Sequence, residues 1–286
     1  MAANTAALRG ITKQYKDFTL GPVDMTVPAG SIVGLIGENG AGKTTLLKIL
    51  CGVNRADSGT VELLGGSPAD PAARAGIGVV FEDAFFYEGF TAAQVGRSLA
   101  GVFGARWRDE AFAAYLRRFG LDAGKKLKEY SRGMRLKLSL AAALAHDPEL
   151  LVLDEATAGL DPVVRGELMD LFLEFIQDER HSIIMSSHIT ADLEQVADSI
   201  AYLHNGQLLF QENKDDLLQE YGVLHCGEDV LTSLPAGLVV FTRRGAYGCE
   251  SLVRERRTVQ ELLPEAVCDA ARLDDIMRFY SGRDAQ

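Results

Sequence analysis

Short apolar runs alternate with amphipathic stretches along most of the chain, and this alternation predicts an α/β fold. The runs at Ser31–Ile36, Leu150–Leu153 and Ser182–Met185 are compact and mainly apolar, which is typical of buried strands in a parallel sheet. Two further strands are predicted at Gly59–Leu64 and Gly76–Phe81. Helices are predicted in three stretches, at Lys43–Leu50, Thr91–Ala145 and Gly166–Arg180. Strands and helices in this order indicate a mainly parallel sheet covered by helices.

The N-terminal segment has a different pattern. Ala7–Gly30 consists of short β segments, with turns predicted at Gly21-Pro22 and at Pro28–Gly30. These segments predict antiparallel strands that precede the α/β core.

The C-terminal part also departs from the alternating pattern. An Asn205-Gly206 pair lies between apolar runs in 200–210 and predicts a β-hairpin. From residue 221 onward the periodicity is weaker, with strands predicted at 238–241 and 251–254 and a closing helix at 272–280. We therefore predict a small C-terminal appendage.

The composition is that of a globular protein, with 47% apolar and 24% charged residues in a chain of 286. The net charge of −11 argues against nucleic acid as a partner, because broad binding to nucleic acid needs a basic face. The four cysteines are not spaced as a metal knuckle or a redox pair, and we interpret them as thiols in a reducing compartment. No signal peptide is apparent, and no apolar run approaches the ~20 residues that cross a bilayer. Any membrane spans must therefore come from another chain.

A glycine-rich segment between a predicted strand and a predicted helix fits the phosphate-loop pattern Gly-x-x-x-x-Gly-Lys-Ser/Thr. Its residues are Gly37, Glu38, Asn39, Gly40, Ala41, Gly42, Lys43, Thr44 and Thr45. Glycines let backbone N–H groups curl around phosphate oxygens, and the helix N-terminus adds partial positive charge. Lys43 can then reach the β- and γ-phosphates, Thr44 can ligate Mg²⁺, and Thr45 is expected near the α-phosphate. The alternative is a glycine-rich turn with a solvent-facing lysine.

Two adjacent carboxylates follow the apolar run that ends at Leu153. Because ligands bind at the carboxyl ends of parallel strands, Asp154 and Glu155 are expected at the same site as the phosphate loop. Asp154 can hold Mg²⁺, and Glu155 is placed to orient or deprotonate the attacking water. The alternative is an acidic loop that caps the next helix.

Four further features resemble the ATP-binding cassettes of ABC transporters, over about residues 5–220. Tyr130–Met134 looks like the signature motif usually written LSGGQ, Ala158–Asp161 like the D-loop, Ser187-His188 like the switch histidine, and Tyr15 like the aromatic residue that packs on adenine.

The resemblance implies a dimer of cassettes in which each ATP lies between the phosphate loop of one chain and the signature of the other. A homodimer is favoured, and the alternative is a pair of paralogous cassettes. Ser131 and Gly133 would then offer a hydroxyl and a backbone N–H to the γ-phosphate. Asp161 and Arg132 would belong to the same cofactor-binding set, and His188 would contact the γ-phosphate and Glu155. The alternatives are that Ser131 is only a helix N-cap and that His188 is structural.

Three positions depart from the cassette pattern. Arg132 replaces the first glycine of the signature, and Met134 replaces its glutamine. Glu82 stands where the family has the glutamine of the Q-loop. A carboxylate could bind Mg²⁺ more tightly but would repel bare phosphate, so we expect hydrolysis with an altered metal dependence.

By this resemblance the fold is a P-loop NTPase core with an antiparallel β subdomain, an α-helical signature subdomain and a C-terminal α+β appendage. The expected domains are residues 1–220, with the helical subdomain at about 88–145, and residues 221–286. The short helical insert is similar to bacterial exporter cassettes of the ABC-2-like type, which pair with a separate multi-span permease at the cytoplasmic face of the membrane. The aromatic segment Phe85–Tyr87 is either a groove for that partner or filling between two lobes.

The variant Q-loop and signature resemble those of cassettes that export amphipathic peptides or peptide antibiotics. One alternative function is a soluble cassette ATPase that acts on nucleic acid or ribosomes, which the acidic balance disfavours. A second is a regulatory module that holds ATP as a switch without useful turnover.

Overall fold

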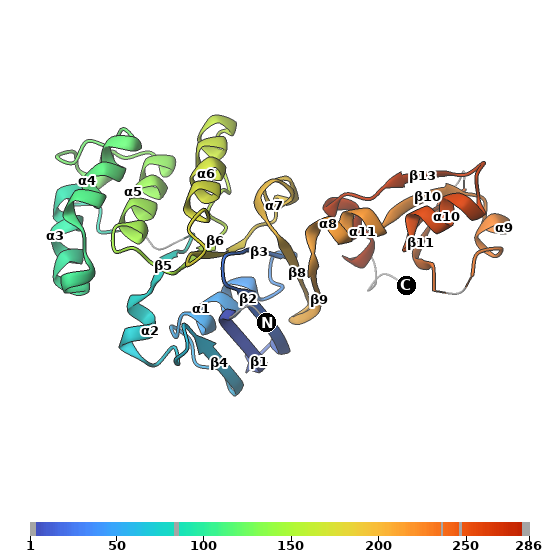
Figure 1. Cartoon of the computed structure of the whole chain (residues 1–286), viewed down its shortest axis with the longest axis horizontal. Helices are drawn as coiled ribbons and strands as arrows, with labels where there is room; N and C mark the ends of the chain where they lie inside the picture. Colours follow the sequence, from blue (N-terminus) through green and yellow to red (C-terminus); the bar gives the residue numbers. More distant parts are fainter. Residues whose placement is uncertain (1–3, 83–85, 236, 246–247, 282–286) are drawn as a thin grey trace. The chain divides into compact units, whose positions relative to one another are not determined.

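The structure is a computed structural model that describes residues 4–82, 86–235, 237–245 and 248–281 (Figure 1). The chain divides into two compact units. The first comprises residues 1–197 and 201–210, and the second comprises residues 198–200 and 211–286.

A six-stranded sheet forms the centre of the first unit and confirms the predicted α/β class. Its order is β5 (Ile77–Val80), β6 (Leu150–Asp154), β7 (Ser182–Ser186), β3 (Ile32–Ile36), β8 (Ser199–His204) and β9 (Gln207–Asn213). The neighbours β5–β6, β6–β7 and β7–β3 run parallel. Strands β3, β6 and β7 are buried along their whole length, as their continuous apolar runs predicted. The carboxyl ends of these three strands therefore meet at one edge of the sheet.

The predicted hairpin is confirmed between β8 and β9. Asn205 and Gly206 both have positive φ angles, 46° and 80°, as a tight two-residue hairpin requires.

A smaller antiparallel sheet in the order β2-β1-β4 precedes the core, with β1 at Asn4–Gln14, β2 at Thr19–Pro28 and β4 at Ser58–Leu63. The turn predicted at Gly21-Pro22 is wrong, because both residues lie inside β2. The chain reverses instead at Tyr15–Phe18, where the Tyr15 N–H donates to the Phe18 carbonyl. Gly21 is needed inside the strand because a Cβ there would lie 1.9 Å from the Ile11 carbonyl oxygen, at an irregularity of the β1–β2 register.

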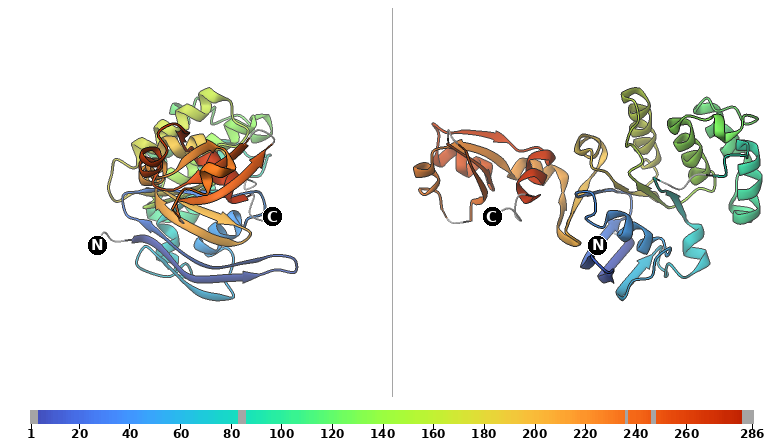
Figure 2. Two further views of the ribbon diagram at one scale, coloured as in Figure 1. Left: turned by 90° about the vertical axis from the view of Figure 1, so that its right-hand side faces the viewer. Right: turned by 180° about the vertical axis from the view of Figure 1, so that it is seen from behind.

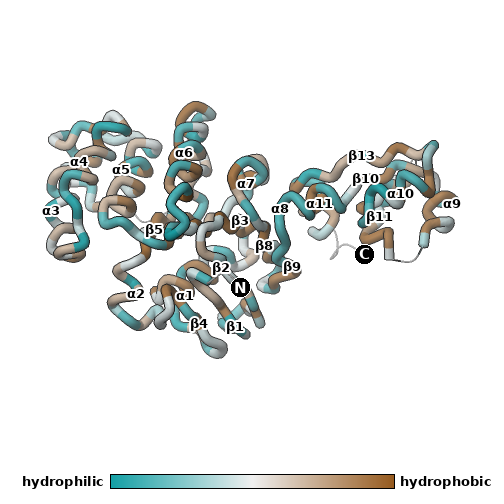
Figure 3. The backbone as a smooth tube through the Cα atoms, in the orientation of Figure 1, coloured by the Kyte–Doolittle hydropathy of each residue, from teal (hydrophilic) through white to brown (hydrophobic). Residues whose placement is uncertain are grey.

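Helix α1 (Lys43–Leu50) packs between the two sheets and joins them into one hydrophobic core. This core combines Leu8 and Val23 of the antiparallel sheet, Leu46 of α1, and Val152 and Ile184 of the parallel sheet. The short helix α2 (Pro71–Ala75) precedes β5. In Figure 3 the tube is brown at β5, which marks hydrophobic residues there.

The stretch predicted to be helical forms three helices, α3 (Ala92–Phe103), α4 (Asp109–Arg118) and α5 (Arg132–Leu144), with 3₁₀ turns at Gly104–Arg106 and Leu127–Glu129. Figures 1 and 2 show the three helices as one group beside the β5 edge of the sheet. They share a second core around Trp107, Phe112 and Leu138.

Helix α6 spans Pro162–Phe175, so the prediction of Gly166–Arg180 was displaced at both ends. The helix starts early because the Asp161 carboxylate accepts hydrogen bonds from the N–H groups of the first turn and Pro162 occupies the first helical position. It stops early because Asp178 binds the backbone and guanidinium of Arg180 in a local turn. The short helix α7 (Thr190–Val196) follows β7.

The second unit has its own antiparallel sheet in the order β11-β12-β10-β13. Its elements are α8 (Lys214–Glu220), β10 (Gly222–Cys226), α9 (Glu228–Leu231), β11 (Val239–Gly245), β12 (Gly248–Val253), α10 (Arg256–Leu262), β13 (Val267–Ala270) and α11 (Leu273–Ser281). A small core around Leu224, Val253 and Val259 holds it together.

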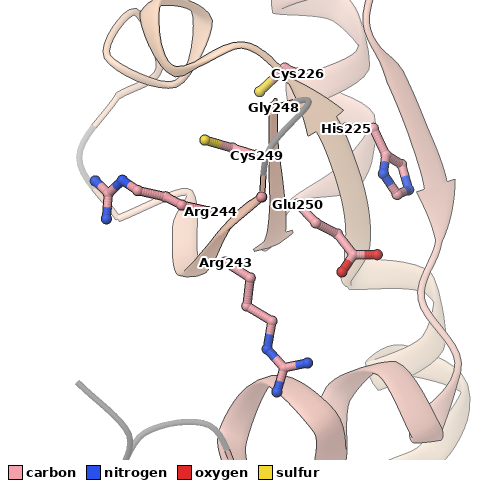
Figure 4. A pocket seen from close by; sticks show the side chains of 8 residues that line it. His225, Cys226, Arg243, Arg244, Gly248, Cys249 and Glu250 are labelled. Atoms are coloured by element: carbon pink, nitrogen blue, oxygen red, sulfur yellow. The ribbon is translucent and has the colours of Figure 1, made fainter.

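All four cysteines are free thiols, as the sequence indicated. Cys226 and Cys249 lie directly opposite each other on β10 and β12 and line a pocket of about 510 Å³ (Figure 4). The arginines beside this pocket are already engaged, because Arg244 pairs with Glu228 and Arg243 donates to the Arg278 carbonyl.

His146 gives the fold a pH dependence. The imidazole is buried, stacks on Phe103 with ring centroids 4.1 Å apart and bonds to the Ile77 carbonyl. Burial lowers the pKa of His146 below its usual value of 6.5. The unfolded chain therefore binds more protons than the folded chain just below that pH, and the stability that neutral His146 provides is lost as the pH falls.

We expect the free energy of unfolding to decrease between pH 7 and 5, and to decrease less in His146→Leu. Urea unfolding at several pH values measures this, with His225→Gln on the exposed face of β10 as control. If the free energy of unfolding changed equally with pH in the wild type and in His146→Leu, His146 would not be the source of the pH dependence.

Candidate nucleotide site

The phosphate loop lies between β3 and α1, as the motif predicted. Gly40 and Gly42 adopt left-handed φ angles of 85° and 106°, which only glycine adopts without strain. A Cβ on Gly37 would lie 2.2 Å from the Leu203 carbonyl oxygen, and one on Gly42 would lie 2.8 Å from the Phe18 ring. These glycines therefore allow a backbone path that larger residues would block.

Lys43 is buried at the centre of this loop, with 6% of its side chain exposed. Its ammonium donates to the Gly37 carbonyl at 2.7 Å and to the Glu38 carbonyl at 3.3 Å. It also lies 3.3 Å from Glu155 Oε1. That last contact is an ion pair without hydrogen-bond geometry, since Glu155 Oε1 is buried and has no hydrogen-bond partner.

Asp154 ends β6 and connects the phosphate loop to the neighbouring strand. Its Oδ2 accepts from the Thr44 hydroxyl at 2.7 Å, and its Oδ1 accepts from the Ser186 hydroxyl at 2.6 Å. The carboxylate is only 2% exposed, and both of its oxygens are hydrogen-bonded. The structure thus brings together Thr44 and Asp154, which the sequence proposed as a pair.

Glu155 follows in a left-handed conformation with φ 51°, which is unusual for a residue with a side chain. Hydrogen bonds from its backbone N–H to the Ser186 carbonyl and hydroxyl stabilise this conformation. Its Oε2 contacts His188 Nδ1 at 2.6 Å. Lys43, Glu155 and His188 therefore form a continuous line of contacts, of which the resemblance implied the one between Glu155 and His188.

Ser186 is a site residue that the sequence analysis missed. Its hydroxyl donates to the Asp154 carboxylate and accepts from the Glu155 backbone N–H, so one group fixes the Asp154 side chain and the Glu155 backbone. Its position beside Asp154 follows from the β6–β7 register, which the sequence alone does not specify.

We expect Ser186→Ala to lower the turnover of ATP by about tenfold or more, because a hydrogen bond to a buried carboxylate contributes roughly 1.5–3 kcal/mol. A phosphate-release assay measures this. Ser187→Ala is the matched control, since within the described part of the chain the Ser187 hydroxyl bonds to Ile189 in its own turn. Equal rates in the two variants would contradict the role of Ser186.

Phe18 is a second residue that the sequence analysis missed. It lines the phosphate-loop pocket of about 240 Å³ together with Gly42, Thr45 and Glu82. Tyr15, the residue proposed to pack on adenine, lies on the same β-turn with its ring centroid 6.4 Å from that of Phe18. Tyr15 is 42% exposed and does not line this pocket.

The signature segment forms the first turn of α5. The Ser131 hydroxyl accepts from the Met134 N–H at 3.2 Å, so the N-cap reading of Ser131 holds in this chain. Gly133 lies within the same turn, and a Cβ on it would meet only Leu160 at 3.7 Å. Arg132 reaches Glu82 at 3.0 Å. Asp161 of the D-loop caps α6.

The predicted aromatic segment falls partly outside the described residues, because Phe85 is among those that the structure does not describe. Phe86 packs against the helical core, which agrees with the filling role. Tyr87 is 73% exposed and lies edge-on to Phe90, with ring centroids 5.4 Å apart.

A phosphate loop with a buried lysine, two carboxylates at the end of the adjacent strand and a histidine after the next strand define a P-loop nucleotide-binding protein. Comparison with known proteins makes this class more specific. Residues 20–158 match the family model described as ABC transporter.

Several curated relatives are similar to this chain. An uncharacterised ABC transporter ATP-binding protein of Synechocystis is 38% identical over 70% of this chain and 58% of its own length. The bacitracin transport ATP-binding protein of Enterococcus faecalis is 34% identical over 72% of this chain and 68% of its own length. The lantibiotic transport ATP-binding protein of Streptococcus pyogenes is 32% identical over 73% of this chain and 90% of its own length. The chain thus matches little more than half the length of the first of these relatives.

Solved structures share the fold. An ATP-binding subunit of an ABC transporter superposes with a TM-score of 0.68 at 28% identity, covering 74% of this chain and 91% of that one. A dimeric ATP-binding cassette bound to ADP and Pi superposes with a TM-score of 0.66 at 23% identity, covering 73% of this chain and 98% of that one. The chain belongs to the ABC transporter family, and the relatives named above are ATP-binding proteins.

Proposed function

We propose that this chain hydrolyses ATP at a site shared between two copies of itself, and that hydrolysis drives a separate membrane permease that exports peptides or other amphipathic compounds. The observation that carries the proposal is the line of contacts from Lys43 through Glu155 to His188, next to the Thr44–Asp154 pair. This proposal includes the roles of the individual site residues. It also includes a separate C-terminal domain at 221–286.

The residues at the site suit Mg²⁺. Thr44, Asp154 and Glu82 present hydroxyl and carboxylate oxygens, which are the ligands that Mg²⁺ prefers. Among the described residues, the structure has no cluster of three or more His, Cys, Asp or Glu that would form a metal cage. Mg²⁺ is commonly bound through one or two carboxylates together with phosphates and waters, and Asp154 and Glu82 would supply the carboxylates. When bound, Mg²⁺ would neutralise charge on the β- and γ-phosphates.

Glu155 is the proposed general base. Its Oε1 is buried and has no hydrogen-bond partner, so it can accept a proton from a water placed beside the γ-phosphate. His188 holds the other oxygen of the same carboxylate and fixes its orientation. Lys43 lies beside both the loop carbonyls and Glu155, where its charge can stabilise the transferred phosphoryl group.

The second copy would complete the site with its signature segment. Ser131 is exposed at the N-terminus of α5, a helix of 13 residues whose first N–H groups favour an anion. Gly133 leaves the surface of this turn open, so a phosphate of an opposing chain could approach the backbone.

A separate permease is proposed because no helix in the described part of the chain is long and apolar enough to cross a membrane. The relatives named for bacitracin and lantibiotic transport support peptide antibiotics as the substrate class. We place the chain at the cytoplasmic face of the bacterial membrane, held there through the permease.

Co-purification tests this proposal. We expect the tagged chain to bring down a multi-span protein from membranes. Tyr87→Ala should lower its recovery severalfold, because an exposed aromatic in this loop suits an interface anchor. Val102→Ala is the matched control, since Val102 is 76% exposed on α3 of the same helical group. Recovery of no membrane protein by the wild-type chain would overturn the transporter proposal.

A further inference from the structure

Two of the residues that depart from the cassette pattern contact each other, although 50 positions separate them in the chain. An Arg132 guanidinium nitrogen donates to Glu82 Oε1 at 3.0 Å. By itself the Glu82 carboxylate would repel phosphate, and Arg132 places a positive charge beside it. Together the two charges neutralise each other.

Glu82 lines two neighbouring cavities. On one side it lines the phosphate-loop pocket with Lys43 and Thr44. On the other side it lines a small cavity with Arg132 and Asp154. The same carboxylate therefore faces both the arginine and the place proposed for Mg²⁺.

The guanidinium of Arg132 also lies close to the D-loop. A Cβ on Gly159 would lie 3.0 Å from Arg132 Nη1, and Gly159 has a left-handed φ of 72°. Arg132 thus lies between the end of β5, represented by Glu82, and the segment that leads into α6. The contact joins the helical group to the sheet beside the site.

We propose that Arg132 and nucleotide-bound Mg²⁺ compete for the Glu82 carboxylate, so that the Glu82–Arg132 pair is a metal-responsive latch on the signature segment. This inference rests on the proposed ATPase function. With nucleotide bound, Glu82 would be among the residues that hold Mg²⁺, so that Arg132 would lose its partner and the first turn of α5 would be free to engage the opposing chain.

The strength of the latch follows from its exposure. The Arg132 and Glu82 side chains are 54% and 45% exposed, so solvent screens their attraction. Pairs of this kind shift an equilibrium by about twofold to fivefold. Such a pair can be broken by a bound divalent ion, and its effect should decrease at high salt.

The test is a Mg²⁺ titration of nucleotide binding, followed with a fluorescent ATP analogue in the Glu155→Gln chain so that binding is measured without turnover. We expect Arg132→Gln to lower the half-saturating Mg²⁺ concentration by about twofold to fivefold, because the competitor for Glu82 is removed. In a Glu82→Gln background the same change should have no such effect. Arg132→Lys should stay near the wild-type value.

Arg135→Gln is the matched control. Arg135 lies in the same first turn of α5 and pairs with Glu88 at 2.7 Å, but Glu88 is bonded within the helical group and does not line the phosphate pocket. We expect Arg135→Gln to leave the Mg²⁺ requirement unchanged.

The experiment distinguishes failure of the proposed function from failure of the Glu82–Arg132 latch. A chain that binds no ATP would overturn the proposed function itself. A chain that binds Mg²⁺ and ATP, but in which Arg132→Gln shifts the Mg²⁺ requirement equally with and without Glu82, or not at all, would overturn only the latch.

Discussion

Glu155→Gln should lower the rate of ATP hydrolysis at least a hundredfold while ATP binding is retained. Loss of one group that stabilises or generates charge in such a site costs about 3–4 kcal/mol in the transition state. A glutamine has the same shape but cannot accept the proton of the attacking water. It also removes the negative charge 3.3 Å from the Lys43 ammonium, so affinity for the triphosphate should not fall. Phosphate release and equilibrium nucleotide binding measure the two effects separately.

Glu149→Gln is the matched control for this change. Glu149 precedes the same strand, is exposed, and contacts Arg106 at the opposite end of β6 from the site. Its substitution should leave turnover within about twofold, since surface changes of this kind are small in free energy. Measurable turnover in Glu155→Gln near the wild-type rate would show that another group is the base.

Lys43→Ala should lower the affinity for ATP about a hundredfold or more and abolish hydrolysis. Lys43 is the buried cation of the phosphate loop, and its removal also leaves Glu155 Oε1 buried without an opposing charge. The loss of the ammonium removes an attraction for the γ-phosphate, and the unopposed Glu155 carboxylate repels it. Titration calorimetry with ATP measures the loss of binding.

Lys48→Ala is the control, because Lys48 lies in the same helix but its ammonium packs over the Phe81 ring, 5.6 Å from the centroid. ATP affinity should be unchanged in that variant. An unchanged affinity in Lys43→Ala would contradict the placement of the triphosphate in this loop.

Much of this site could be predicted from sequence because its residues sit at the ends of strongly patterned elements. The apolar runs before Gly37 and Asp154 are buried on both faces, and parallel pairing brings their carboxyl ends to one edge. Local spacing therefore sufficed for Lys43, Thr44 and Asp154.

The sequence did not reveal contacts that depend on register or on long-range approach. Ser186 reaches Asp154 only because β6 and β7 pair in one particular register. Phe18, in the turn between β1 and β2, lies close to Gly42 of the phosphate loop. Arg132, in the helical group, donates to Glu82, which follows β5. A turn was also wrongly predicted at Gly21, where a strand irregularity requires glycine. The start of α6 was predicted too late, because Asp161 and Pro162 begin the helix.

The shared site between two chains is tested most directly by the mass of the Glu155→Gln protein in solution, with and without Mg²⁺ and ATP, measured by light scattering. We predict a monomer without nucleotide and a dimer with it. We also predict that adding Ser131→Asp keeps the chain monomeric although it still binds ATP, since aspartate caps the helix as well as serine but repels a phosphate. A chain that stays monomeric with ATP, or a dimer that Ser131→Asp does not disturb, would contradict the account.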